Sequence, residues 1–96
     1  MRYSIVLAPE AIDDLNKLKV NLRAEVKDGI ETHLRHEPTK VSKSRIKRLR
    51  GLKRPQYRLR LNEVRVFYDV SEDTVEVLAI VEKAQADDWL ERHGER

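Results

Sequence analysis

The chain has 96 residues and no cysteine, which excludes disulfide bonds, thiolate metal sites and a cysteine nucleophile. Its size predicts a single domain over residues 1–96. Hydrophobic residues make up 40% and charged residues 39%, so we expect one modest core. The apolar run near the N-terminus is too short for a signal peptide or a membrane span, so we expect a soluble, cytoplasmic protein.

The charges are segregated along the chain, although the formal net charge is only +3. Residues 1–39 contain 6 basic residues (Lys or Arg) and 7 acidic residues (Asp or Glu). Residues 40–65 contain 11 basic and 1 acidic, and residues 66–96 contain 3 basic and 9 acidic. Such a basic centre creates a local positive field, for which polyphosphate backbones are the commonest partners. The alternative interpretation is a solvated basic loop.

The first half of the sequence predicts a strand followed by two helices. Tyr3–Leu7 favours a β-strand, and apolar residues at helical spacing predict a first helix over Glu10–Lys19. Asn21 is the expected N-cap of a second amphipathic helix, in which apolar residues recur at every fourth position over Leu22–Leu34 before Pro38 closes it. Because so few residues join the helices, we expect an α-helical hairpin with a shared apolar face.

The second half changes to the period of two that is typical of β-strands. After a basic, irregular segment at 39–54, alternating patterns predict three strands at 57–61, 64–70 and 74–81, and then a short helix at 84–92. The expected fold class is α+β, with an N-terminal strand, an α-helical hairpin, an antiparallel β-meander packed on the hairpin and a short C-terminal helix.

Alternation within the meander predicts an outward-facing group of arginines. If Asn62–Glu63 forms a two-residue turn, Arg60 lies opposite Arg65, with Arg58 on the same face. Like charges at facing positions destabilise a sheet by roughly 0.2–1 kcal/mol, which favours an anionic ligand over selection for stability alone. The alternative is a surface kept soluble by charge. In this register Phe67 also faces outward and could stack an unpaired base, or it could be buried under the last helix.

The basic segment and this face together supply the candidate nucleic-acid-binding residues, which are Lys43, Arg45, Lys47, Arg48, Arg50, Lys53, Arg54 and Phe67. The three histidines, at positions 33, 36 and 93, lie away from the arginine face, so none is expected to be a catalytic acid or base. The spacing of the first two does not match a zinc helix, and we expect neither a metal site nor a cofactor.

The order of elements, together with the motifs Arg48–Leu52, Tyr57–Leu61 and Val64–Tyr68, resembles the RelE/ParE toxin superfamily over nearly the whole chain. That resemblance implies a toxin of a type II toxin-antitoxin system, held silent by a small antitoxin in a hetero-oligomer. RelE-like members enter the ribosomal A site and cut mRNA, whereas ParE-like members inhibit DNA gyrase.

The resemblance also implies a catalytic set, namely Arg58, Arg60, Arg65 and Lys83. RelE-like ribonucleases add an arginine just after the last strand and a tyrosine in the final helix, where this sequence has Ala84 and Leu90. Lys83 or Gln85, one position away, could replace that arginine. Proton removal would then fall to Glu63, Glu82, Lys83 or the ribosome itself.

Three functions follow from these observations. The first is a ribosome-dependent mRNA endoribonuclease that inhibits translation and arrests growth. The alternative is a non-nucleolytic, ParE-like inhibitor of DNA gyrase, and the third is a decayed domain that only binds the antitoxin. The expected partners are therefore a cognate antitoxin and either mRNA on the ribosome or gyrase, with no membrane partner.

Overall fold

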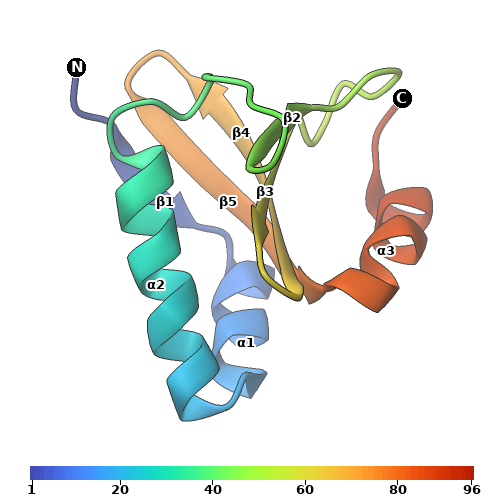
Figure 1. Cartoon of the computed structure of the whole chain (residues 1–96). Helices are drawn as coiled ribbons and strands as arrows, with labels where there is room; N and C mark the ends of the chain where they lie inside the picture. Colours follow the sequence, from blue (N-terminus) through green and yellow to red (C-terminus); the bar gives the residue numbers. More distant parts are fainter.

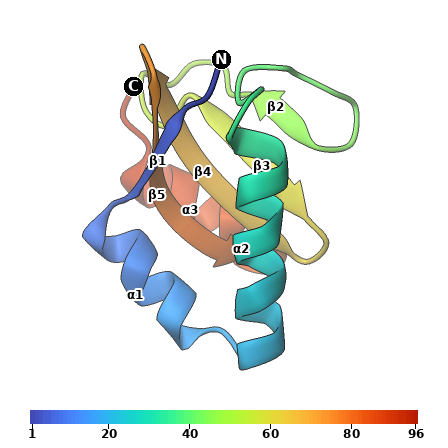
Figure 2. The same ribbon diagram turned by 90° about the vertical axis from the view of Figure 1, so that its left-hand side faces the viewer.

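The computed structural model describes residues 1–96, and a five-stranded sheet lies between two layers of helix (Figure 1). The elements in chain order are β1 (Ser4–Leu7), α1 (Pro9–Lys17), α2 (Val20–Leu34), β2 (Ile46–Arg48), β3 (Tyr57–Leu61), β4 (Val64–Ser71), β5 (Thr74–Glu82), the 3₁₀ turn η1 (Lys83–Gln85) and α3 (Ala86–His93). Figure 2 shows α1 and α2 in front of the sheet and α3 behind it. The predicted α+β class is confirmed. None of the helices has the length and hydropathy of a membrane-spanning segment.

The helical hairpin forms as predicted, but its second helix begins earlier. Leu18 and Lys19 are the extended residues between the helices, so α2 starts at Val20 and its N-cap is Lys19, which makes no side-chain capping bond. The expected N-cap at Asn21 is therefore wrong, because Asn21 lies within the first helical turn.

The order of the strands is β1-β5-β4-β3-β2, and the meander β3-β4-β5 is antiparallel as predicted. Two features of the sheet were not predicted. β1 pairs in parallel with β5, and β2 forms an edge strand within the segment expected to be irregular. β2 has only three residues, of which only Ile46 favours a strand, so its pairing with β3 rather than its own pattern creates it.

The larger core lies between the sheet and the helical hairpin. It contains 14 buried residues, drawn from both helices and from β2, β3, β4 and β5. Gly29 permits this packing, because a Cβ there would lie 2.5 Å from the nearest Leu61 methyl carbon. Tyr68 is fully buried in this core, stacks on Tyr57 and donates its hydroxyl hydrogen bond to the Pro38 carbonyl at 2.6 Å.

Tyr68 gives the fold a predictable response to alkali. Burial, and then the nearby Tyr57, raise the pKa of Tyr68 above the usual value for tyrosine. The unfolded chain loses this proton above about pH 10 while the folded chain keeps it, so this group lowers the free energy of unfolding by about 1.4 kcal/mol per pH unit there.

Tyr68→Phe should therefore cost about 1 kcal/mol at pH 7, where the hydrogen bond to Pro38 is lost. The difference in unfolding free energy between the wild type and Tyr68→Phe should disappear by pH 11, because the variant lacks the group whose titration destabilises the wild type. Urea unfolding at pH 7, 10 and 11 measures both effects, and a gap that stays constant with pH would contradict them.

α3 packs on the opposite face of the sheet over a smaller cluster. Phe67 and Ala79 of the sheet lie against Ala86 of α3, with Leu49 and Val81 partly buried beside them. The Phe67 and Trp89 rings stack with centroids 4.9 Å apart and an interplanar angle of 8°. This stack holds α3 beside the face that carries the arginines.

Candidate nucleic-acid interface

A cleft of about 270 Å³ opens between the sheet and the start of α3. Its lining combines four cations, one carboxylate and four apolar side chains, namely Lys47, Leu49, Arg58, Arg65, Phe67, Lys83, Ala86, Asp87 and Leu90. Strands β2, β3 and β4 supply the cations of the sheet, while η1 and α3 supply the opposite wall. We call it the cationic cleft.

The register of the meander brings its cations together as the alternation predicted. The turn at Asn62–Glu63 places Arg60 opposite Arg65, and Asn62 adopts the positive φ of 52° that a short hairpin turn needs. In the neighbouring pair of strands, Lys47 lies opposite Arg58. Like charges therefore face each other twice, and the sheet gains no stability from either pair.

Arg65 is the most buried cation of the cleft, with a relative exposure of 6%. One Nη donates to the carbonyls of Asn62 at 2.7 Å and Val64 at 3.1 Å, and no carboxylate lies within ion-pair distance. Burial, and then Arg58 and Arg60, lower the pKa of Arg65, which is evidence of a desolvated and repelled charge. The expectation that Arg65 faces open solvent is wrong.

The two arginines of β3 are more exposed than Arg65. Arg58 is half-buried, and its buried Nε has no hydrogen-bond partner in the protein. Arg60 is exposed. None of the three guanidiniums is in an ion pair, so an anion entering this site would meet donors that the protein leaves available.

The wall from α3 differs from the sequence-based expectation. Lys83 lines the cationic cleft, whereas Glu63 and Glu82 line a neighbouring hollow that shares Lys83 with it. The carboxylate that does line the cleft is Asp87, which sequence reasoning missed. Its spacing of four residues from Lys83 was the signal that could have found it.

Residues 5–87 of the chain match the family described as "ParE toxin of type II toxin-antitoxin system, parDE". The chain belongs to this toxin family.

Several solved structures of RelE toxins have a fold similar to that of this chain. The toxin shares 25% identity with the RelBE2 toxin-antitoxin complex from Mycobacterium tuberculosis, at a TM-score of 0.72, over 85% of this chain and 99% of that chain. The archaeal RelE-RelB complex from Pyrococcus horikoshii is 22% identical at a TM-score of 0.71, over 88% of this chain and 99% of that chain. A mutant of E. coli toxin RelE in the free state is 23% identical at a TM-score of 0.70, over 92% of this chain and 90% of that chain. No curated protein matches the toxin in sequence.

The basic segment of the toxin does not act as one surface. Lys43 lies exposed in the loop before β2, while the Arg45 guanidinium donates to the Arg60 carbonyl at 3.0 Å, beside the arginine face. Lys47 lines the cationic cleft. Arg48, the next residue of β2, lies over the Tyr57 ring at 5.0 Å on the other face of the sheet, so its predicted place on the nucleic-acid face is wrong.

The last three predicted basic residues lie farther from the cleft floor. Arg50 lines a hollow that shares Asp87 and Leu90 of α3 with the cationic cleft, and it remains a candidate for the rim of the interface. The Lys53 backbone N–H donates to the Glu95 carbonyl at 2.6 Å, which places Lys53 beside the C-terminal segment.

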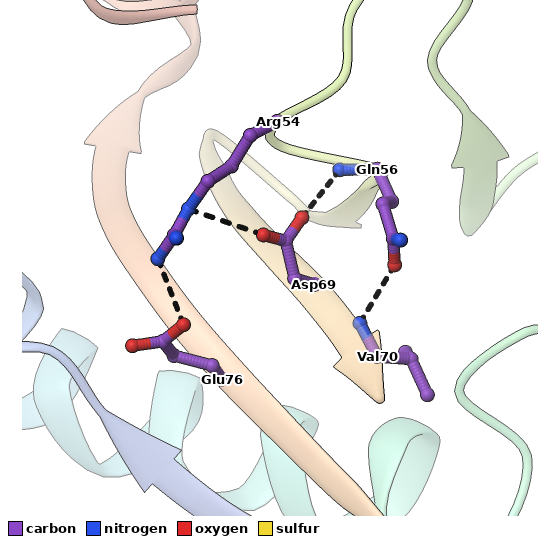
Figure 3. Close-up of polar contacts among 5 residues, drawn as sticks. All are labelled: Arg54, Gln56, Asp69, Val70 and Glu76. Atoms are coloured by element: carbon purple, nitrogen blue, oxygen red, sulfur yellow. Dashed lines mark hydrogen bonds and ion pairs between the residues drawn. The ribbon is translucent and has the colours of Figure 1, made fainter. Parts of the chain in front are cut away.

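Arg54 is neutralised by the protein's own carboxylates (Figure 3). It pairs with Asp69 at 3.2 Å and with Glu76 at 2.8 Å, so its predicted role as a free phosphate ligand is wrong. Asp69 also accepts the Gln56 backbone N–H, and burial raises the pKa of Asp69 despite these partners. The network positions the chain before β3.

Phe67 is fully buried, so the expectation of an exposed stacking platform is wrong. The Trp89 ring of α3 covers its face, which leaves no surface for a base. Phe67 instead lies beneath the cleft and supports the wall that carries Asp87 and Leu90.

Proposed function

We propose that this ParE-family toxin is a ribosome-dependent endoribonuclease that cleaves mRNA, inhibits translation and arrests growth. The observation that carries the proposal is the group of guanidiniums at the cationic cleft, which have no carboxylate partner although one of them is buried. Burying a charge is costly unless a counter-charge arrives, and a phosphodiester supplies one in the planar geometry that guanidiniums match.

The reaction is transesterification within the RNA strand. The ribose 2′-oxygen forms a bond to the adjacent phosphorus while the bond from phosphorus to the 5′-oxygen of the next nucleotide breaks. This leaves a 2′,3′-cyclic phosphate and a free 5′-hydroxyl. Arg58 and Arg65 stabilise the charge that develops on the non-bridging oxygens, a preorganised electrostatic role, and Arg60 holds the strand at the exposed rim.

Two groups of the cleft can carry the protons. The Asp87 carboxylate accepts the proton of the 2′-hydroxyl, and the Lys83 ammonium donates one to the departing 5′-oxygen. Both stand on the η1–α3 side of the cleft, across from the arginines of the strands. The ribosome holds the strand in the geometry that brings these groups into reach.

A second candidate function is inhibition of DNA gyrase without nucleolysis. It is favoured by the family description, which names ParE, and by Leu90, whose apolar side chain lines the cleft where the RelE resemblance implies a tyrosine. Inhibition of supercoiling by the purified toxin, with translated mRNA left intact, would support this candidate over the first.

We also propose a cognate antitoxin as the toxin's partner in a hetero-oligomer. The M. tuberculosis and P. horikoshii structures are toxin-antitoxin complexes, which supports such a partner for this chain. An acidic antitoxin segment would suit the cationic cleft and would mask it from RNA. Exposed sheet edges and exposed apolar side chains such as Val6 and Val41 offer the remaining contacts.

Neighbouring residues of β2 supply a matched test of which face binds RNA. Lys47 and Arg48 are both exposed cations on one strand, but Lys47 lines the cationic cleft and Arg48 packs on Tyr57 across the sheet. Lys47→Ala should reduce mRNA cleavage about tenfold, because one charged contact to the substrate is lost. Arg48→Ala should leave cleavage within about twofold, since surface changes away from a site have small effects.

Primer extension on mRNA in a translating extract measures both variants against the wild-type toxin. Equal losses in the two variants would show that net charge matters and the face does not. Intact transcripts with the wild-type toxin would remove the endoribonuclease proposal itself.

A further inference from the structure

The C-terminal end of α2 and the segment after it enclose a second hollow, of about 190 Å³, outside the cationic cleft. Its polar side chains are Thr32, His33, His36, Glu37, Lys40, Ser42 and Arg45. Glu37 is the hollow's one carboxylate, and it pairs with Lys40 at 3.4 Å in an exposed contact that contributes little stability. The balance of charge in the hollow is therefore positive.

Arg45 connects this hollow to the arginine face. Its Nη1 donates to the Arg60 carbonyl at 3.0 Å, and the Arg60 backbone N–H donates to the Arg45 carbonyl at 2.9 Å. Arg60 is directly opposite Arg65 on β4, so Arg45, Arg60 and Arg65 occupy neighbouring positions along the backbone from the hollow to the cleft. A polyanion lying in the cleft has a charged path around this edge of the sheet.

Ser42 supplies a donor at the same place. Its Oγ accepts hydrogen bonds from the backbone N–H groups of Arg45 at 3.0 Å and Ile46 at 3.3 Å. Accepting both bonds leaves the hydroxyl proton to donate to a ligand. These bonds also position the backbone from which the Arg45 side chain extends.

We propose that the hollow binds a phosphodiester of the same single-stranded RNA whose reacting phosphate lies in the cationic cleft. The inference rests on the proposed endoribonuclease function, and it extends the RNA site beyond the face on which the sequence placed it. Arg45 and Lys40 provide charge, Ser42 provides a neutral donor, and His33 provides a ring N–H, whereas His36 Nδ1 is already bonded to the Met1 carbonyl at 3.2 Å.

His33 makes binding in the hollow depend on pH. It is half-buried near the end of α2, and it faces His36, Glu37, Lys40 and Arg45 from the segment that follows the helix. Burial, and then the charge of Arg45, lower the pKa of His33, so the free toxin at pH 7 holds this ring neutral. A bound phosphate favours the imidazolium, so binding raises the His33 pKa, takes up a proton and becomes tighter as the pH falls.

Binding of a fluorescein-labelled, 2′-O-methyl single-stranded RNA to the intact toxin tests the inference, because this probe lacks the reacting hydroxyl. Arg45→Ala should weaken binding about tenfold at low salt and reduce the slope of log Kd against log salt by about 0.7, the value for one lost phosphate contact. His33→Ala should remove most of the change in Kd between pH 5.5 and 7.5. Matched controls are Arg92→Ala and His93→Ala in the last turn of α3, which should bind as the wild type does.

Titration of the histidine rings by NMR adds a second measurement. The midpoint of His33 should rise when the RNA probe is added. An unshifted His33 midpoint would overturn its assignment to the RNA site.

The outcomes separate this inference from the proposed function. Unchanged affinity and salt slope in Arg45→Ala, with weakened binding in Lys47→Ala, would overturn the hollow as an RNA site and leave the cationic cleft intact. A loss of affinity in Arg45→Ala for the antitoxin alone would also overturn it, because the hollow would then belong to a protein partner. Loss of RNA binding in Arg45→Ala alongside uncut mRNA in translation would support the hollow and reject nucleolysis.

Discussion

Arg65→Met should reduce mRNA cleavage by a factor of about 10² to 10³, the usual effect of removing one preorganised donor from a developing oxyanion. Arg65 lines the cleft beside Arg58 and is held by the carbonyls of Asn62 and Val64, so its guanidinium is oriented before any substrate arrives. Methionine keeps most of the side-chain volume and removes the charge.

The same substitution should leave the free energy of unfolding unchanged or raise it. Arg65 is buried without a carboxylate and beside other guanidiniums, so its charge opposes folding, and apolar replacement of buried ions is often neutral or stabilising. Loss of activity with retained stability is the signature of a residue kept for function.

Primer extension in a translating extract and urea unfolding provide the two measurements for Arg65→Met. Arg48→Met is the matched control, because it removes an arginine from the opposite face of the sheet. Retained cleavage in Arg65→Met would contradict the assigned role. A large fall in stability would contradict the electrostatic account of its burial.

Phe67→Ala should lower the free energy of unfolding by about 3–5 kcal/mol, the range for removing a buried phenyl group. Phe67 is fully buried and stacks on Trp89, so its loss removes the main contact that holds α3 against the sheet. The cationic cleft should widen when α3 moves away from the sheet, because α3 carries Asp87 and Leu90 of the cleft lining. Cleavage should fall even at temperatures where the variant remains folded.

Trp89 reports this directly, because it is the only tryptophan of the chain. In Phe67→Ala its emission should shift to longer wavelength as the ring becomes exposed to water. Phe67→Leu is the matched control, since it keeps apolar volume and should lose roughly 1 kcal/mol of aromatic stacking. Unchanged Trp89 emission and unfolding free energy in Phe67→Ala would show that α3 is held by other contacts.

Local pattern was enough to predict most elements and the pairing of the central strands. Side chains on a strand alternate between faces, so the period of two identified which residues of β3 and β4 face the core. A two-residue turn permits one register, which is why the facing pair Arg60 and Arg65 could be predicted from the sequence. The same reasoning could not find β2, because three residues are too few to show a period.

The candidate site also combines properties that local sequence determines with properties that only tertiary contacts determine. The sequence by itself determined the cationic character of the candidate interface, because the charges, the strand alternation and the turn are local properties of the chain. Only the tertiary structure decided which cations are available and how deeply they lie. Packing of α3 on the sheet buries Phe67 and places Asp87 at the cleft. The path of the chain before β3 places Arg54 in ion pairs with Asp69 and Glu76. Burial and ion pairing are set by residues distant in sequence, and no pattern within one strand or loop records them.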